Sequence, residues 1–153
     1  MFIDKVPNIS VNLNYLSFEY KTIKDRFTDV TNHGNKVLVQ RKFQLMIKNE
    51  FTDKTENLIY TRKIHDQLKS LLDYNSITYR FVLPNTCYNW HMDTGQTCLH
   101  IPIITNPGCW FVYENRCFHM PADGSVYKVD NSRLHTFINA GSEPRLHLTF
   151  EIL

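Results

Sequence analysis

Residues 145–152 read Arg-Leu-His-Leu-Thr-Phe-Glu-Ile, in which polar and apolar side chains alternate without exception. Because successive side chains of a β-strand point to opposite faces, this segment predicts a strand with one polar and one apolar face. Residues 98–103 repeat the pattern, with a cysteine, a histidine and a proline opposed to a leucine and two isoleucines. We expect the two polar faces to line a pocket and the two apolar faces to pack outward against helices.

Short strand-like segments separated by turn signals fill the chain from residue 76 onward. Asn-Pro-Gly at residues 106–108 and Pro-Ala-Asp-Gly at residues 121–124 are turn signatures. The segments expected to be strands are 77–83, 90–93, 98–104, 109–113, 125–129, 134–138 and 145–152. Many short strands at this spacing are typical of a β-sandwich or a jelly roll, so we predict a mainly β fold.

The first 75 residues follow a different pattern. Residues 16–20 alternate as a strand would, and residues 23–30 carry apolar side chains at helical spacing. Residues 32–35, Asn-His-Gly-Asn, predict a turn. Residues 37–45 are rich in strand-forming side chains and predict a strand.

An amphipathic helix is predicted near residues 61–73. Its apolar stripe consists of Ile64, Leu68, Leu71 and Leu72, which recur at the spacing of one helix face. This stripe is available to cover the apolar faces of the strands. Since the β core needs such a cover, we expect both halves to belong to one domain.

Composition and charge exclude several classes of protein. Aromatic residues make up 13% and charged residues 21% of the chain, which is typical of a globular and not of a disordered protein. The net charge of +2 is too small to indicate binding to nucleic acid. No run of about 18 apolar residues occurs, so no membrane span is expected.

The four cysteines are expected to be free thiols. They are Cys87, Cys98, Cys109 and Cys117, and none of them belongs to a C-x-x-C pair. The N-terminus shows no export signal, so we expect a reducing, cytoplasmic location. A disulfide and a cysteine zinc site are the alternatives.

His91, Asp93 and His135 are the candidate metal ligands. The first two lie two residues apart, on one face of a predicted strand, and the third can approach from another strand. Two imidazoles and one carboxylate bind Fe(II) and leave positions open for chemistry, although an isolated His-x-Asp can also be a solvated turn or an ion pair. Trp90 indicates a partly buried position, where an unpaired carboxylate would be costly.

Arg145 adds a second signal to this set. A guanidinium offers two parallel donors to a carboxylate and stays protonated, so it suits an acidic cosubstrate. Together with the His/Asp/His set it suggests a non-haem iron oxygenase that uses 2-oxoglutarate.

Residues 90–153 resemble the aspartyl/asparaginyl β-hydroxylase family, which includes bacterial proline hydroxylases. The matching pieces are His91-Met92-Asp93, Leu99-His100-Ile101-Pro102-Ile103, Asn106-Pro107, Gly124, Asp130-Asn131, His135, Asn139 and Arg145-Leu146-His147-Leu148. The resemblance implies a double-stranded β-helix (a cupin-like jelly roll) with a few flanking helices. It also implies Fe(II), 2-oxoglutarate and O2. The carboxylate at Asp93 makes the chain more similar to the proline hydroxylases.

Carried over by this resemblance, His91, Asp93 and His135 match the iron ligands. Arg145 matches the arginine that binds the distal carboxylate of 2-oxoglutarate. His100 matches a histidine that contacts the cosubstrate, and its alternative role is that of a buried structural histidine.

One position departs from the family pattern. Cys98 stands where some relatives place a further arginine for the cosubstrate. Arg80 or His147 could compensate for it. Arg80 could equally contact the substrate or be a plain exposed charge.

We therefore predict a 2-oxoglutarate-dependent dioxygenase that hydroxylates a small-molecule amino acid or a peptidyl residue. The alternative is a cupin-like metal-binding or sensing module without oxygenase activity, for which Arg145 would have no use. A zinc hydrolase is a third reading, but no general base stands at a suitable spacing. Neither nucleic acid nor a membrane is expected as a partner. We expect a single domain over residues 1–153, with residues 1–75 covering a metal-bearing β core at residues 76–153.

Overall fold

The computed structural model describes residues 2–31, 38–93 and 97–153. Its helices are α1 (Leu13–Ile23), the short 3-10 helix η1 (Lys24–Arg26) and α2 (Ile59–Leu68). Its strands are β1 (Ile3–Ser10), β2 (Thr28–Thr31), β3 (Leu38–Ile47), β4 (Glu50–Phe51), β5 (Ser76–Val82), β6 (Thr86–Cys87), β7 (Thr97–Ile104), β8 (Cys109–Tyr113), β9 (Arg116–Phe118), β10 (Ser125–Asp130), β11 (His135–Asn139) and β12 (Arg145–Glu151). The prediction of a mainly β fold is confirmed.

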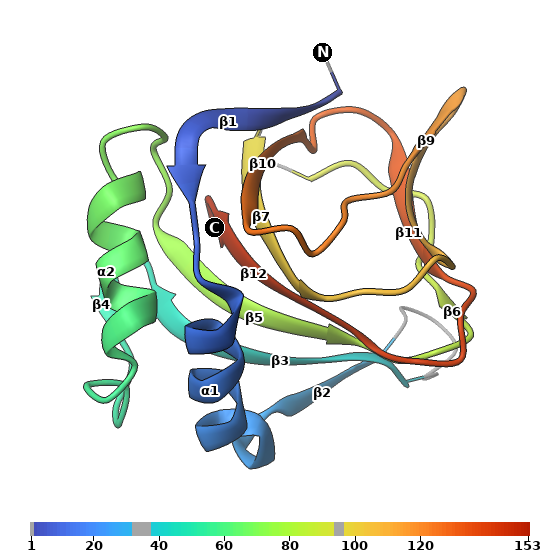
Figure 1. Cartoon of the computed structure of the whole chain (residues 1–153). Coiled ribbons are helices and arrows are strands. Elements are labelled where there is room, and N and C mark those ends of the chain that lie inside the picture. Colours follow the sequence, from blue (N-terminus) through green and yellow to red (C-terminus); the bar gives the residue numbers. More distant parts are fainter. Residues whose placement is uncertain (1, 32–37, 94–96) are drawn as a thin grey trace.

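Two antiparallel sheets make up the fold. The larger sheet has the strand order β1-β10-β7-β12-β5-β3-β2, with β4 added beside β3, and the smaller has the order β6-β11-β8-β9. Figure 1 shows the two sheets facing each other, with α1 and α2 on the side of the larger sheet that is turned away from the smaller one. This is the predicted cupin-like jelly roll with a few flanking helices.

The two faces of β12 are used as the alternation predicts. This strand lies between β5 and β7 in the larger sheet. Its apolar side chains Leu146, Leu148 and Phe150 are fully buried in one cluster with Ile64 and Leu68 of α2. The polar face therefore points the other way, toward the smaller sheet, and the functional side chains of β12 lie there.

The strand predicted at residues 16–20 is wrong, because this segment belongs to α1. The Asn12 side chain caps the helix by accepting hydrogen bonds from backbone N–H groups of its first turn. The helix buries Leu16 and Ile23 at helical spacing, while Phe18 is 70% exposed. The apparent alternation therefore combined the core residue Leu16, the exposed Phe18 and the partly buried Tyr20.

Helical spacing over residues 23–30 is also misleading beyond the end of α1. After Ile23 the chain forms η1 and then the edge strand β2, which pairs with β3. The strand predicted at residues 37–45 is confirmed as β3 from Leu38 onward. The turn predicted at residues 32–35 lies outside the described residues.

The amphipathic helix is confirmed but begins and ends earlier than predicted. Ile64 and Leu68 are buried, whereas Leu71 lies beyond the end of α2 and is 52% exposed. The Glu19 carboxylate of α1 accepts hydrogen bonds of 2.7 and 2.8 Å from the first N–H groups of α2, at Tyr60 and Thr61. A carboxylate at a helix N-terminus is favourable, so this contact fixes the two helices together on the sheet.

Six of the seven strands predicted after residue 76 are confirmed, within one or two residues at each end. The seventh, at residues 90–93, is wrong: only His91 pairs there, in an isolated bridge to His135. The pattern missed β1, β2, β4, β6 and β9. The cysteines are free, as predicted. Among the described residues, no helix is long and apolar enough to cross a membrane.

Candidate metal and anion site

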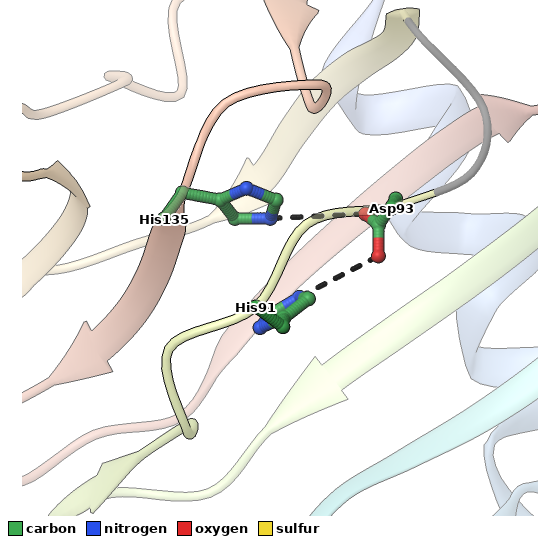
Figure 2. Close-up of side chains that lie close together, drawn as sticks. All are labelled: His91, Asp93 and His135. Atoms are coloured by element: carbon green, nitrogen blue, oxygen red, sulfur yellow. Dashed lines mark ion pairs between the residues drawn. The ribbon is translucent and has the colours of Figure 1, made fainter.

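Three candidate ligands converge, as Figure 2 shows, with the carboxylate of Asp93 facing both imidazoles. The Nε2 atom of His91 lies 3.6 Å from Oδ1 of Asp93, and Nε2 of His135 lies 3.7 Å from Oδ2. One ligand atom from each residue lies within 4.8 Å of the others. Residues far apart in the sequence thus present two nitrogens and a carboxylate oxygen to one point, the donor set that suits Fe(II).

Backbone hydrogen bonds bring the two histidines together. His91 and His135 exchange N–H to carbonyl hydrogen bonds of 2.9 Å in both directions. Each imidazole also has its Nδ1 atom 2.7 Å from a backbone carbonyl oxygen, that of Asn89 or that of Arg133. Since a carbonyl only accepts, Nδ1 carries the proton in both rings. The lone pair is therefore on Nε2, the atom directed at Asp93, as a metal ligand requires.

Asn131 holds the carboxylate of the set. Its side-chain Nδ2 atom donates to Oδ2 of Asp93 over 3.0 Å, and its backbone carbonyl oxygen accepts from the backbone N–H of Asp93 over 3.0 Å. Asn131 is itself buried. In the sequence this asparagine follows a predicted strand, where asparagine is typical of a turn. Only its spatial position reveals that it orients a ligand.

Exposure differs among the three residues. His135 is buried against the Phe111 ring, with the ring centroids 4.9 Å apart, and burial lowers its pKa. The side chains of His91 and Asp93 are about two-fifths exposed. The expectation that Trp90 marks a partly buried position is wrong, since this side chain is 51% exposed. Residues 90–93, here called the rim, are joined to β11 by one bridge. Every second side chain of this segment points outward.

All six predicted site residues line one cavity of about 430 Å³, here called the main cavity. Its lining includes His91, Asp93, His135, Arg145, His100 and Arg80, together with Gln40, Tyr88, Cys98, Phe111, Asn131, Phe137, Thr149, Glu151, Ile152 and Leu153. The polar faces of β7 and β12 thus contribute to a pocket, as the alternation predicts.

Arg145 lies at the buried end of this cavity. It is 4% exposed, and its guanidinium carbon sits 3.6 Å from the centre of the Phe137 ring. Its Nε and Nη1 atoms are buried and have no hydrogen-bond partner in the described parts of the chain. Burial lowers the pKa of Arg145 to about 9. A buried cation without a counterion is costly, so this end of the cavity is suited to an anion with two acceptor oxygens.

Arg80 has a different environment. It forms an ion pair with Glu151, and its Nε atom donates to Oγ1 of Thr149 over 3.3 Å. Arg80 is thus half-buried and already paired, which excludes the reading of a plain exposed charge. Cys98 lies in the same cavity, fully buried, and burial raises the pKa of its thiol well above the usual value.

His100 and His147 form a buried pair. Their Nδ1 atoms are 3.0 Å apart, and burial lowers the pKa of both imidazoles well below the usual value. His100 lines the main cavity. His147 lies behind it and lines a second, smaller space with Arg145. His147 therefore does not line the main cavity itself, and it is linked to this cavity by its contact with His100.

Comparison with known proteins gives a family and a fold. The family model described as aspartyl/asparaginyl beta-hydroxylase matches residues 10–153. No curated protein sequence matches the chain.

Several solved structures share the fold and cover nearly the whole chain. An oxidoreductase of the 2OG-Fe(II) oxygenase family from Burkholderia pseudomallei has a TM-score of 0.67 at 14% identity, covering 97% of this chain and 84% of its own. A prolyl hydroxylase from Trichoplax adhaerens, in complex with a peptide fragment of the hypoxia inducible factor oxygen degradation domain, has a TM-score of 0.67 at 13% identity. The match covers 98% of this chain and 83% of the Trichoplax chain. A Pseudomonas putida prolyl-4-hydroxylase has a TM-score of 0.68 at 10% identity, and the match covers 98% of this chain and 91% of the Pseudomonas chain. At such identities the likeness is one of fold.

Proposed function

The chain belongs to the aspartyl/asparaginyl β-hydroxylase family, and we propose that it is an Fe(II)- and 2-oxoglutarate-dependent oxygenase that hydroxylates an amino acid or a peptidyl residue. One observation carries the proposal. A His/Asp/His set and a buried guanidinium without a hydrogen-bond partner among the described residues line the same cavity. The first suits a ferrous ion and the second a dicarboxylate.

The residues present fit both groups. His91, Asp93 and His135 would hold Fe(II), with Nε2 lone pairs already directed at one point and Asp93 oriented by Asn131. Arg145 would hold the distal carboxylate of 2-oxoglutarate and would find in it the hydrogen-bond acceptors that the described residues do not supply. When bound, iron and 2-oxoglutarate would supply the chemistry that activates O2, with 2-oxoglutarate as the two-electron reductant, so that O2 can hydroxylate a C–H bond. The protein contributes orientation and the exclusion of water.

Arg145 also separates the proposal from its alternative, a metal-binding or sensing module without oxygenase activity. Such a module needs the His/Asp/His set alone. A cation buried beside Phe137, with no hydrogen-bond partner in the part of the chain that the structure describes, would then be a cost with no use. The geometry therefore favours the oxygenase.

We expect substrates to approach from the rim at residues 90–93, where His91 and Asp93 are partly exposed. Small molecules and peptidyl residues both remain candidates. The peptide bound by the Trichoplax prolyl hydroxylase supports a peptidyl substrate. Four free thiols are compatible with a reducing compartment, which supports the predicted cytoplasmic location.

The test is anaerobic titration of the metal-free protein with Fe(II) and then with 2-oxoglutarate. We expect a visible charge-transfer band that forms only when both are present, followed by O2 uptake and succinate release on exposure to air. Iron binding without a band, and O2 uptake that does not depend on 2-oxoglutarate, would support the alternative. A His65→Gln variant is a suitable control, because His65 lies on α2 and hydrogen-bonds Tyr74.

A further inference from the structure

We propose that His147 is a positioning residue that fixes the tautomer of His100 and so presents the His100 Nε2–H group to the main cavity as a donor for a carboxylate. The carboxylate ligand rests on the proposed function, whereas the tautomer does not. The pair would make the anion end of the cavity a two-part site, formed by the Arg145 cation and a neutral N–H group.

The first step is that the two imidazoles share one proton. His100 on β7 and His147 on β12 lie on neighbouring strands, and their Nδ1 atoms are 3.0 Å apart. Both side chains are buried, at 6% and 1% exposure. Burial and the charge of Arg145 lower the pKa of each ring, so both are neutral. One Nδ1 therefore carries a proton and donates it, and the other accepts.

The second step decides the direction of this hydrogen bond. The Nε2 atom of His147 is buried and has no hydrogen-bond partner in the described chain. It belongs to a ring that lines the same small space as Arg145, which lies two residues earlier on the same face of β12. An unpartnered buried N–H group is more costly than an unpartnered lone pair, so this nitrogen carries the lone pair. The Nε2 atom of His100 is not in this situation, because its ring lines the main cavity. The proton of His147 is therefore on Nδ1, which donates to Nδ1 of His100.

The third step follows from the chemistry of imidazole. A neutral ring that accepts through Nδ1 carries its proton on Nε2. For His100 this is the nitrogen not engaged by His147, and the ring lines the main cavity together with Arg145. An Nε2–H group can donate to a carboxylate oxygen, whereas the other tautomer would direct a lone pair at that oxygen and repel it.

The tautomer can be read directly in the wild-type protein. We would label histidine with 15N, record two-bond 1H–15N spectra of the metal-free protein, and assign His100 and His147 with the variants His100→Gln and His147→Asn. We expect protonated Nε2 in His100 and protonated Nδ1 in His147. The reverse pattern, with the His100 proton on Nδ1, would overturn the inference whatever the protein catalyses.

The consequence for binding is tested with two variants at one position. His147→Leu removes the donor, and His147→Asn places an amide that can donate from the position of Nδ1. From the size of a hydrogen bond to a charged group, we expect the Kd for 2-oxoglutarate, read from the anaerobic charge-transfer band, to rise about tenfold in the leucine variant. In the asparagine variant it should stay within about threefold of wild type, and Fe(II) affinity should not change in either.

These outcomes keep the inference apart from the proposed function. A leucine variant that binds 2-oxoglutarate as tightly as wild type would refute the positioning role. Absence of a band in the wild type would refute the proposed function, and the tautomer would still be decided by the 15N spectra. Should the leucine variant fail to fold, the wild-type spectra and the asparagine variant carry the test.

Discussion

At the rim of the main cavity, His91 and Asp93 lie on a segment joined to β11 by a single bridge. At its buried end, Arg145 and His100, with His147 behind them, lie on two central strands of the larger sheet. The rim ligands are partly exposed and depend on local hydrogen bonds for their positions. The buried residues are held by strand pairing on both sides. One cavity thus combines a metal site that has two of its three ligands outside the regular strands with an anion site built by a sheet, and each end should respond differently to mutation.

The largest effect is expected from His135→Ala, because this residue is the one ligand of the set that the sheet itself positions. Turnover of 2-oxoglutarate should fall by at least about 100-fold, the range in which loss of a metal ligand exceeds loss of a supporting contact. Succinate release and Fe(II) binding measure the effect, with His65→Gln as the control. Undiminished succinate release would refute the assignment of the metal site.

A mutation at the buried end of the cavity should change the affinity for the anion more than the affinity for the metal. In Arg145→Met the Kd for 2-oxoglutarate should rise by about 10- to 100-fold through loss of charge-assisted hydrogen bonds, with Fe(II) affinity unchanged. The ligand-free variant should be more stable than wild type by about 1–3 kcal/mol, because an uncompensated buried charge is gone. Denaturant unfolding at pH 7 checks this, and a less stable variant would contradict it.

The same variant gives a pH dependence with a defined sign. Burial lowers the pKa of Arg145 to about 9 in the folded protein, below its value in the unfolded chain. The unfolded state therefore holds the proton more tightly, and the destabilisation is fully present below pH 9 and declines as the pH rises above it. The stability difference between wild type and Arg145→Met should shrink above pH 9. A difference that stays constant up to pH 10.5 would contradict this.

At the rim, Asn131→Ala should weaken Fe(II) binding by about tenfold, the lower end of the effect of removing a group that orients a metal ligand. At saturating Fe(II) the Kd for 2-oxoglutarate should not change, because Asn131 contacts Asp93 and not the arginine end. Competition with a colorimetric chelator measures the metal affinity, and Asn14→Ala on the exposed side of α1 is the control. An equal loss of affinity for Fe(II) and for 2-oxoglutarate would contradict the distinction between the two ends of the cavity.

The smallest effect is expected from Arg80→Gln. Because Arg80 is already paired with Glu151, the Kd for 2-oxoglutarate should change by less than about threefold, the effect of a distant screened charge. A loss comparable to that of Arg145→Met would instead show that Arg80 compensates for the cysteine at position 98.

Much of the fold and of the candidate site could be predicted from the sequence. Strict alternation in residues 145–152 identified both the strand and the face that lines the cavity, because the period of a strand is a local property. The positions of His91, Asp93, His135 and Arg145 followed from residue type and from a family resemblance. The helix α1 was not predicted because a short apolar alternation and a helix stripe share positions, and its one local start signal is the cap at Asn12.

The parts that could not be predicted depend on pairing between distant segments. Asn131 orients Asp93, and His147 faces His100, only because β10, β7 and β12 are neighbours in the sheet. Neither residue has a local signature of this role. The exposure of Trp90 was likewise a matter of how its segment sits on β11, which its own side chain does not encode.

The contact between Arg145 and Phe137 has a consequence for binding entropy. The ring covers one face of the guanidinium at 3.6 Å, so the plane of the fork is set while the chain folds. An arriving dianion then freezes few side-chain rotations, and less of its interaction energy is lost to ordering. Lysine, which has neither a flat face to stack nor a fork, would carry the same charge without this advantage.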